Sequence, residues 1–197
     1  MPRTQFRKSR SREATTTTSV IASAAKSVLV TAGVAALANI GRKIVTQAPT
    51  AMASDWCEGL IREHEATLAA LDKLAAISAE HPQRRAVQLT MLKQLITKHA
   101  LEEENVVYPM LRRGGDGDAV GDLHKDHGEV KAMLYELSQM DKADPAFDVT
   151  LEGLRSSLQE HMRQEEEVLF PALRAQLSDE ENRKLTRTMN MAGVMVA

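Results

Sequence analysis

Two segments of the sequence place a histidine four residues ahead of a glutamate, directly before an apolar run. They read "HALEEENVVYPMLRR" from His99 and "HMRQEEEVLFPALRA" from His161. When the segments are aligned, Glu103 falls on Glu165 and the prolines of the two apolar runs coincide. An internal repeat of this kind indicates that one unit is used twice. Residues four apart project from the same face of a helix, so each pair presents an imidazole and a carboxylate together.

The surrounding pattern buries both pairs. Apolar residues recur at the helical period from Ser54 onward, and each His–Glu pair occupies the apolar stripe, where Leu or Val would otherwise be expected. A carboxylate buried without a partner costs several kcal/mol. Placing two of them in one core therefore requires a compensating cation.

Further histidines complete a candidate ligand set. His64 lies on the apolar stripe of the first helix and His127 on that of the third, with His124 at the edge of the same stripe. His81 precedes Pro82 in an expected loop and is set aside. Imidazole and carboxylate ligands suit iron, manganese, zinc or copper better than calcium. Two metal ions bridged by two glutamates would neutralise both carboxylates, and the expected ligands are His64, His99, Glu103, His124, His127, His161 and Glu165.

The neighbouring residues are expected to play lesser parts. We expect solvent to surround Glu102, Glu104, Glu166 and Glu167; for Glu104 and Glu166, orienting a ligand histidine is the alternative. Tyr108 and Phe170, which occupy matching positions in the repeat, are expected to be core residues.

The rest of the composition narrows the fold and the function. The chain has 197 residues, 43% of them apolar and 26% charged, which is typical of a globular protein. The single Cys57 excludes an internal disulfide and a thiolate metal cluster. No Gly-rich phosphate loop and no nucleophile elbow occurs, so nucleotide and common hydrolase chemistry are unsupported.

Helix signals divide residues 51–177 into four long helices joined by short loops. Asp55 is a candidate N-cap, Pro82 suits a first helical position, and "RRGGDGD" and "DKADP" are loops. Short connections favour antiparallel neighbours, which predicts an all-α protein with an up-down four-helix bundle. Residues 178–197 are expected to form a short C-terminal helix, with Ser178 as its cap, and a tail.

The first fifty residues differ in kind from the bundle. Residues 1–19 are basic and polar, typical of a disordered tail, and residues 20–50 form an apolar helical extension. We expect a cytoplasmic protein whose extension packs on the domain or on a partner. Peripheral membrane contact and export are the alternatives, and binding of nucleic acid by the tail is not expected.

The ligand pattern resembles the hemerythrin-like family, also called the HHE cation-binding domain. That family has a histidine on the first helix, His-x-x-x-Glu on the second and fourth, and one or two histidines on the third. Here these are His64, "HALEE", "HMRQE" and "HKDH", and the resemblance covers about residues 54–175. It implies a non-haem centre of two carboxylate-bridged iron ions that binds or senses O₂, peroxide or nitric oxide, or handles iron.

The sequence departs from the oxygen-carrying branch of the family. The third-helix histidines are three residues apart rather than four, and the last acid is Glu165, four residues after His161, rather than an aspartate at five. This pattern is closer to the bacterial and regulatory branch. We expect both His124 and His127 to ligate, with His127 alone as the alternative.

Three functional hypotheses remain open at this point. The first is a di-iron binding or sensing module. The second is an enzyme at the same centre, for peroxide dismutation or ferroxidase chemistry. The third is a metal-free helical interaction module.

Overall fold

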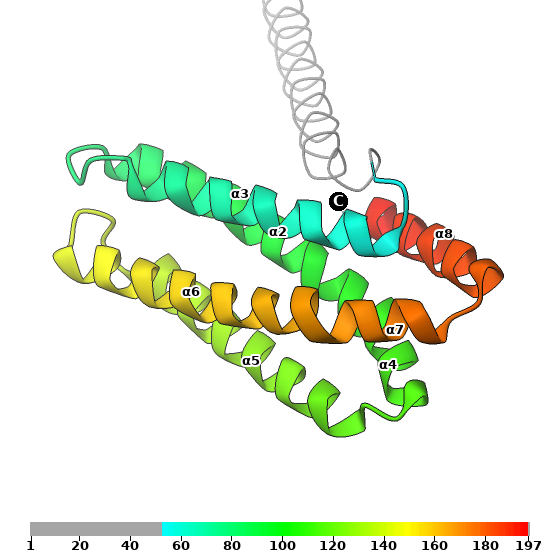
Figure 1. The fold of residues 1–197 in the computed structure, drawn as a ribbon. Helices are drawn as coiled ribbons and strands as arrows, with labels where there is room; N and C mark the ends of the chain where they lie inside the picture. The colour runs from blue at the N-terminus through cyan, green and yellow to red at the C-terminus, as the bar shows by residue number, and fades with distance from the viewer. Residues whose placement is uncertain (1–52, 197) are drawn as a thin grey trace, which may run out of the picture. The chain divides into compact units, whose positions relative to one another are not determined.

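Four long helices form an antiparallel up-down bundle, as the sequence predicts (Figure 1). The structure, a computed structural model, describes residues 53–196, so the expected tail at 1–19 and extension at 20–50 lie outside the described residues. The bundle helices are α2 (Trp56–Ala75), α3 (Pro82–Glu102), α5 (Gly117–Gln139) and α6 (Pro145–Gln164). Each contacts two others, in the cyclic order α2, α3, α5, α6. The four apolar stripes therefore face one interior.

Local signals start and stop these helices. The side chain of Asp55 caps α2 by accepting a hydrogen bond from the backbone N–H of Glu58, and Pro82 opens α3. Asp144 caps α6 by accepting from the N–H of Ala146. The loop before α5 turns at Gly115, which has a φ of 109°. Glycine adopts this backbone conformation without the steric strain that a side chain would cause. In the part of the chain that the structure describes, no helix has the length and hydropathy to cross a membrane.

The internal repeat is also a repeat of backbone geometry. Each of the two glutamates expected as ligands begins a π-helical turn, η1 (Glu103–Val107) and η2 (Glu165–Leu169), followed by the short helices α4 (Tyr108–Gly114) and α7 (Phe170–Gln176). The N–H of Tyr108 donates to the carbonyl of Glu103, five residues back, and Phe170 donates to Glu165 in the same way. The next residue in each case is the repeated proline, which has no N–H to donate and crowds the preceding turn of an α-helix. A wider turn accommodates that proline.

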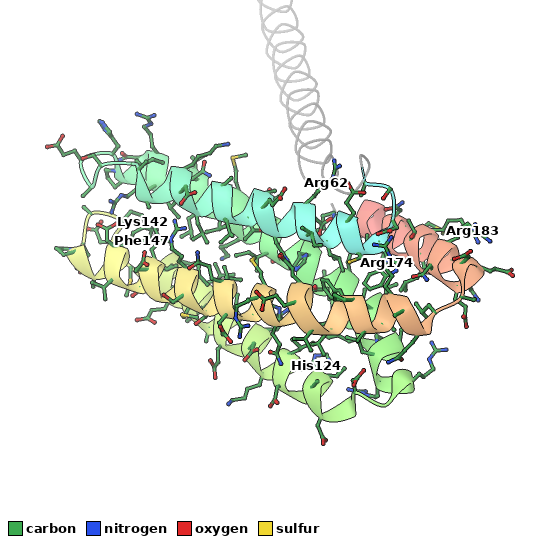
Figure 2. The ribbon with its side chains drawn as sticks, in the orientation of Figure 1. Arg62, His124, Lys142, Phe147, Arg174 and Arg183 are labelled. Atoms are coloured by element: carbon green, nitrogen blue, oxygen red, sulfur yellow. The ribbon has the colours of Figure 1, made fainter. Side chains whose placement is uncertain are left out.

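Two apolar clusters fill the bundle and leave a polar layer between them. One cluster, which includes Trp56, Leu60 and Phe170, lies toward α7 and α8. The other includes Leu71 and Phe147 and lies toward the opposite end of the bundle, where Figure 2 labels Phe147. On α2 the first cluster ends at Leu60 and the second begins at Ala70. His64 lies in the interval, which places the candidate ligands inside the bundle.

The C-terminal helix is longer than the sequence predicts. Helix α8 (Asp179–Val196) has 18 residues and begins with the expected cap, because Ser178 and Glu181 exchange hydrogen bonds. Its Asn182 accepts a 2.9 Å hydrogen bond from the indole N–H of Trp56. Leu185 and Met189 are buried in the first apolar cluster. Helix α8 thus covers one end of the bundle through contacts with α2, α3 and η1.

Candidate metal centre

Six of the seven expected ligands meet in the polar layer. They form two groups of ligand atoms, each group lying within 4.8 Å, and the groups share Glu103. Every member is buried: His64, His99, Glu103 and Glu165 make up the first group, and Glu103, His127 and His161 the second. They come from α2, α3, α5, α6 and the first residues of the two π turns.

The first group is built around a pair of histidines. His64 Nε2 and His99 Nε2 lie 2.9 Å apart. Glu103 Oε1 is 3.2 Å from His99 Nε2, and Glu165 Oε2 is 3.4 Å from His64 Nε2. Two nitrogens and two carboxylate oxygens therefore surround one point.

The second group repeats this arrangement with a second pair of histidines. His127 Nε2 and His161 Nε2 are 3.1 Å apart. Glu103 turns its other oxygen, Oε2, to within 3.3 Å of His127 Nε2, and Glu165 Oε2 is 3.4 Å from His161 Nε2. Each glutamate thus faces both histidine pairs, which is the placement that a carboxylate needs to bridge two cations.

Two oxygens of these glutamates indicate that a cation belongs here. Glu103 Oε1 and Glu165 Oε2 are buried, and neither has a hydrogen-bond partner among the described residues. Leaving a buried carboxylate oxygen unpaired is costly, and metal coordination removes that cost. Four imidazoles with two carboxylates suit a first-row transition metal such as iron. The residues present therefore fit a metal centre.

The electrostatics of the centre point the same way. Burial alone would lower the pKa of His99, but the carboxylates of Glu103 and Glu63 hold this pKa well above its usual range. Burial would raise the pKa of Glu103, whereas His99 and His127 hold it well below its usual range. The chain therefore keeps a negative carboxylate among basic imidazoles. A metal ion that binds there must displace protons from those imidazoles.

A carboxylate lies near the outer nitrogen of each histidine in the two groups. Their Nδ1 atoms face Glu166 at 2.6 Å from His64, Glu63 at 3.2 Å from His99, Glu104 at 2.9 Å from His127 and Asp126 at 3.5 Å from His161. The three hydrogen-bonded partners fix the orientation of their imidazoles, as outer partners of ligating histidines do, whereas Asp126 makes no hydrogen bond to His161. The sequence suggested this role for Glu104 and Glu166 as an alternative. The sequence pattern does not indicate this position for Glu63 or Asp126. Each directly precedes a histidine of the apolar stripe and therefore lies off the stripe itself.

The expectation that Glu102 is solvated is wrong. Its side chain is fully buried, and both of its oxygens accept hydrogen bonds from the ammonium of Lys98, at 2.9 and 2.8 Å. Lys98 is buried as well and also donates to Glu63. Burial and the nearby Glu63 raise the pKa of Glu102 to about 8, because two carboxylates share the one ammonium. A spacing of i, i+4 on α3 and a facing acid on α2 produce this cluster, which the apolar period does not reveal.

Tyr108 does more than fill the core. Its ring is buried as expected, and its hydroxyl donates a 2.8 Å hydrogen bond to Glu165 Oε1. The hydroxyl oxygen of Tyr108 also lies 3.2 Å from His127 Nε2. At the matching position of the repeat, Phe170 stacks on His64 with ring centroids 6.2 Å apart and has no polar atom to offer. At this repeated position the two sides of the centre therefore differ by one hydroxyl group.

The structure does not bring His124 into either ligand group. Its side chain is exposed on α5, where Figure 2 labels it, and its ring lies edge-on to Tyr108 with centroids 5.3 Å apart. His127 occupies the buried stripe of the same helix. His81, set aside from the sequence, is exposed before α3.

A small cavity adjoins the centre. It has a volume of about 30 Å³, and its lining includes His99, His127 and His161. The rest of the lining is mostly apolar, with contributions from Ile96, Val130, Leu158 and Met162. A space of this size accepts one water-sized or diatomic molecule.

Comparison with known proteins agrees with this geometry. An iron-sulfur cluster repair protein, YtfE, of Enterobacter sp. (strain 638) is 28% identical over 116 residues, covering 51% of this chain and 52% of the relative. An uncharacterised hemerythrin-like protein of Schizosaccharomyces pombe is 34% identical over 90 residues, 44% of each chain. A DNA nickase of Nostoc sp. is 33% identical over 101 residues, 51% of this chain and 28% of the relative. The chain spans about half or less of the length of these curated relatives.

The family match covers the whole centre. The hemerythrin HHE cation-binding domain matches residues 58–173, more than half of the chain, from just before the first ligand histidine to just beyond the second π turn. With its histidines and glutamates gathered on the four helices of the bundle, the chain belongs to the hemerythrin HHE cation-binding domain family.

Proposed function

We propose that this protein holds two iron ions and uses them to bind or sense a small ligand, O₂, peroxide or nitric oxide. One observation carries the proposal. Two pairs of buried histidines flank two glutamates, and each glutamate has an oxygen without a hydrogen-bond partner among the described residues. His64 and His99 would hold one ion and His127 and His161 the other, with Glu103 and Glu165 shared between them. When bound, iron supplies open coordination positions and redox activity for the exogenous ligand.

The chain's own residues restrict what can reach such a centre. The apolar cavity beside His99, His127 and His161 favours a small uncharged molecule over a large or charged one. The hydroxyl of Tyr108 fixes Glu165 through its hydrogen bond. Hydrogen bonds to Glu166, Glu63 and Glu104 hold three of the imidazoles in place, so those ligands are oriented before a metal arrives.

Iron handling is a second candidate, and the relatives favour it. The printed name of YtfE assigns iron-sulfur cluster repair to that protein, and the aligned part covers about half of it. A role in supplying or storing iron would use the same residues. DNA cleavage is not carried over from the nickase, because the match covers 28% of that relative.

The deciding experiment is metal analysis after anaerobic reconstitution with ferrous iron. We expect about two irons per chain, and optical spectra that change when argon is replaced by air. Retention of one iron, or of zinc alone, would contradict the proposed centre. A protein with less than one transition metal per chain would instead support the metal-free interaction module.

Added peroxide separates the binding protein from an enzyme. A binding or sensing protein is expected to consume peroxide in stoichiometric amounts. Continuous evolution of O₂ would assign peroxide dismutation to the same centre.

A further inference from the structure

An acidic pocket opens on the surface above one ligand histidine. It lies between α5 and α6, has a volume of about 360 Å³, and its floor is His161. The remaining lining consists of Asp126, Glu129, Ser156, Ser157 and Glu160. Arg163 binds Glu160 through two hydrogen bonds, of 2.7 and 3.1 Å, so Asp126 and Glu129 carry most of the pocket's free negative charge.

The histidine at the floor has a buried ring nitrogen without a hydrogen-bond partner among the described residues. This nitrogen is Nδ1 of His161, a residue that is only 3% exposed. The nearest carboxylate oxygen, Asp126 Oδ2, is 3.5 Å away. The other three ligand histidines have their Nδ1 atoms 2.6–3.2 Å from a carboxylate. His161 is thus the ligand histidine whose outer nitrogen faces an open pocket.

His161 Nδ1 and Asp126 Oδ2 face each other across 3.5 Å, and the nitrogen makes no hydrogen bond to any described residue. Both lie in the lining of the acidic pocket, together with Glu129 and Glu160. An imidazole nitrogen beside carboxylate oxygens is a ligand set that suits a divalent first-row metal ion.

A cation bound between Asp126 and His161 gives the unpartnered nitrogen a partner. We propose that the pocket of Asp126, Glu129, Ser156, Ser157 and Glu160 is a second cation site, which takes up a ferrous ion and passes it to the buried centre through His161. The carboxylates concentrate the ion, and Asp126 with His161 Nδ1 coordinates it. A rotation of the His161 side chain then delivers the ion to His127 and the two glutamates. This inference rests on the proposed iron centre.

The loading rate of the metal-free full-length chain tests the pocket. Ferrous uptake is followed anaerobically by stopped flow, and the final iron content is measured separately. We expect the double variant Asp126→Asn/Glu129→Gln to load about tenfold more slowly, because it loses the charge that gathers the ion. Its final content should stay at the wild-type value, since His127, His161 and the two glutamates of the buried centre are unchanged. The matched control, Glu136→Gln/Glu152→Gln, removes exposed acids from the same two helices and should load at the wild-type rate.

A second pair of variants keeps the inference testable if the first folds poorly. Ser157→Lys puts a positive charge in the pocket and should slow loading, whereas Gln159→Lys puts the same charge on an exposed position of α6 outside it. Wild-type rates in both pocket variants, or equal slowing in pocket variants and controls, would overturn the uptake site. A wild-type protein that never reaches two irons would instead refute the proposed function. The two failures are therefore distinguishable.

Discussion

The two sides of the centre have matching ligands in unlike surroundings. Around His64 and His99 the outer carboxylates are engaged at 2.6 and 3.2 Å, and one of them, Glu63, is bound by the buried ammonium of Lys98. Around His127 and His161 the outer carboxylates are Glu104, bound by the exposed Lys131, and Asp126, which is partly exposed and 3.5 Å away.

The second side also has the more polar aromatic neighbour and more open space than the first side. Phe170 gives the first side an apolar wall, whereas Tyr108 gives the second a hydroxyl. The open acidic pocket lies over His161, and the small cavity touches both histidines of the second side but only His99 of the first. For the proposed two-iron centre, this difference predicts that the first side holds its ion firmly and that the second side exchanges ions or ligands.

The largest effect should come from the residue that both sides share. Glu103→Ala removes an oxygen from each group, so iron content should fall from about two per chain to one or fewer. His81→Ala, an exposed histidine outside the centre, is the control and should keep both irons. Metal analysis checks both, and a Glu103→Ala protein that retains two irons would show that the glutamate does not bridge.

The next prediction contrasts the two ammonium groups behind the centre. Lys98→Met leaves two buried carboxylates without their ammonium and should lower the free energy of unfolding by roughly 3–5 kcal/mol. Lys131→Met breaks an ion pair whose lysine is 58% exposed and should cost about 0–1 kcal/mol. Lysine and methionine have similar helix propensities, so backbone effects cancel. Urea unfolding of the metal-free proteins measures both, and equal losses would remove this difference between the sides.

The sequence predicts which residues gather in the polar layer better than it predicts the environment of those residues. A His–Glu pair on the apolar stripe is visible because the helical period makes any buried polar residue stand out. Glu63 and Asp126 act across helices from positions off the stripe, so their role depends on crossing geometry that no single helix encodes. The burial of Glu102 likewise requires Lys98 and Glu63 to meet it from two helices.

The same limit applies to the fold. Caps and loops predict the four long helices, and Pro109 predicts a disturbance at the end of the second. The structure shows that this disturbance is a π turn, and that a second π turn precedes Pro171. The helical period alone does not reveal which kind of turn accommodates the proline. The packing of α8 depends on Trp56 meeting Asn182, residues far apart in the sequence.

A smaller effect should follow from making the aromatic positions alike. Tyr108→Phe removes the donor to Glu165 Oε1 and should lower the free energy of unfolding of the metal-free protein by about 1–3 kcal/mol. Iron content should stay at two, because the hydroxyl orients a ligand and is not itself among the expected ligands. Urea unfolding and metal analysis on the same preparation give both numbers. Loss of one iron would instead make Tyr108 a ligand of the second side.

The smallest effect concerns His124, which the sequence places among the ligands and the structure leaves outside both groups. Residues three apart on a helix fall about 60° short of a full turn, so His124 lies at the edge of the stripe that buries His127. There its ring is exposed and packs edge-on to Tyr108. Without His124 each side has two imidazoles and shared carboxylates, whereas with it the second side would have a third nitrogen and one fewer open position.

We therefore expect His124→Ala to keep two irons, to titrate with azide like the wild type in its oxidised form, and to lose about 0.5 kcal/mol of stability from the ring contact. A lower iron content or a shifted azide spectrum would restore His124 to the centre and make the second side the more crowded one.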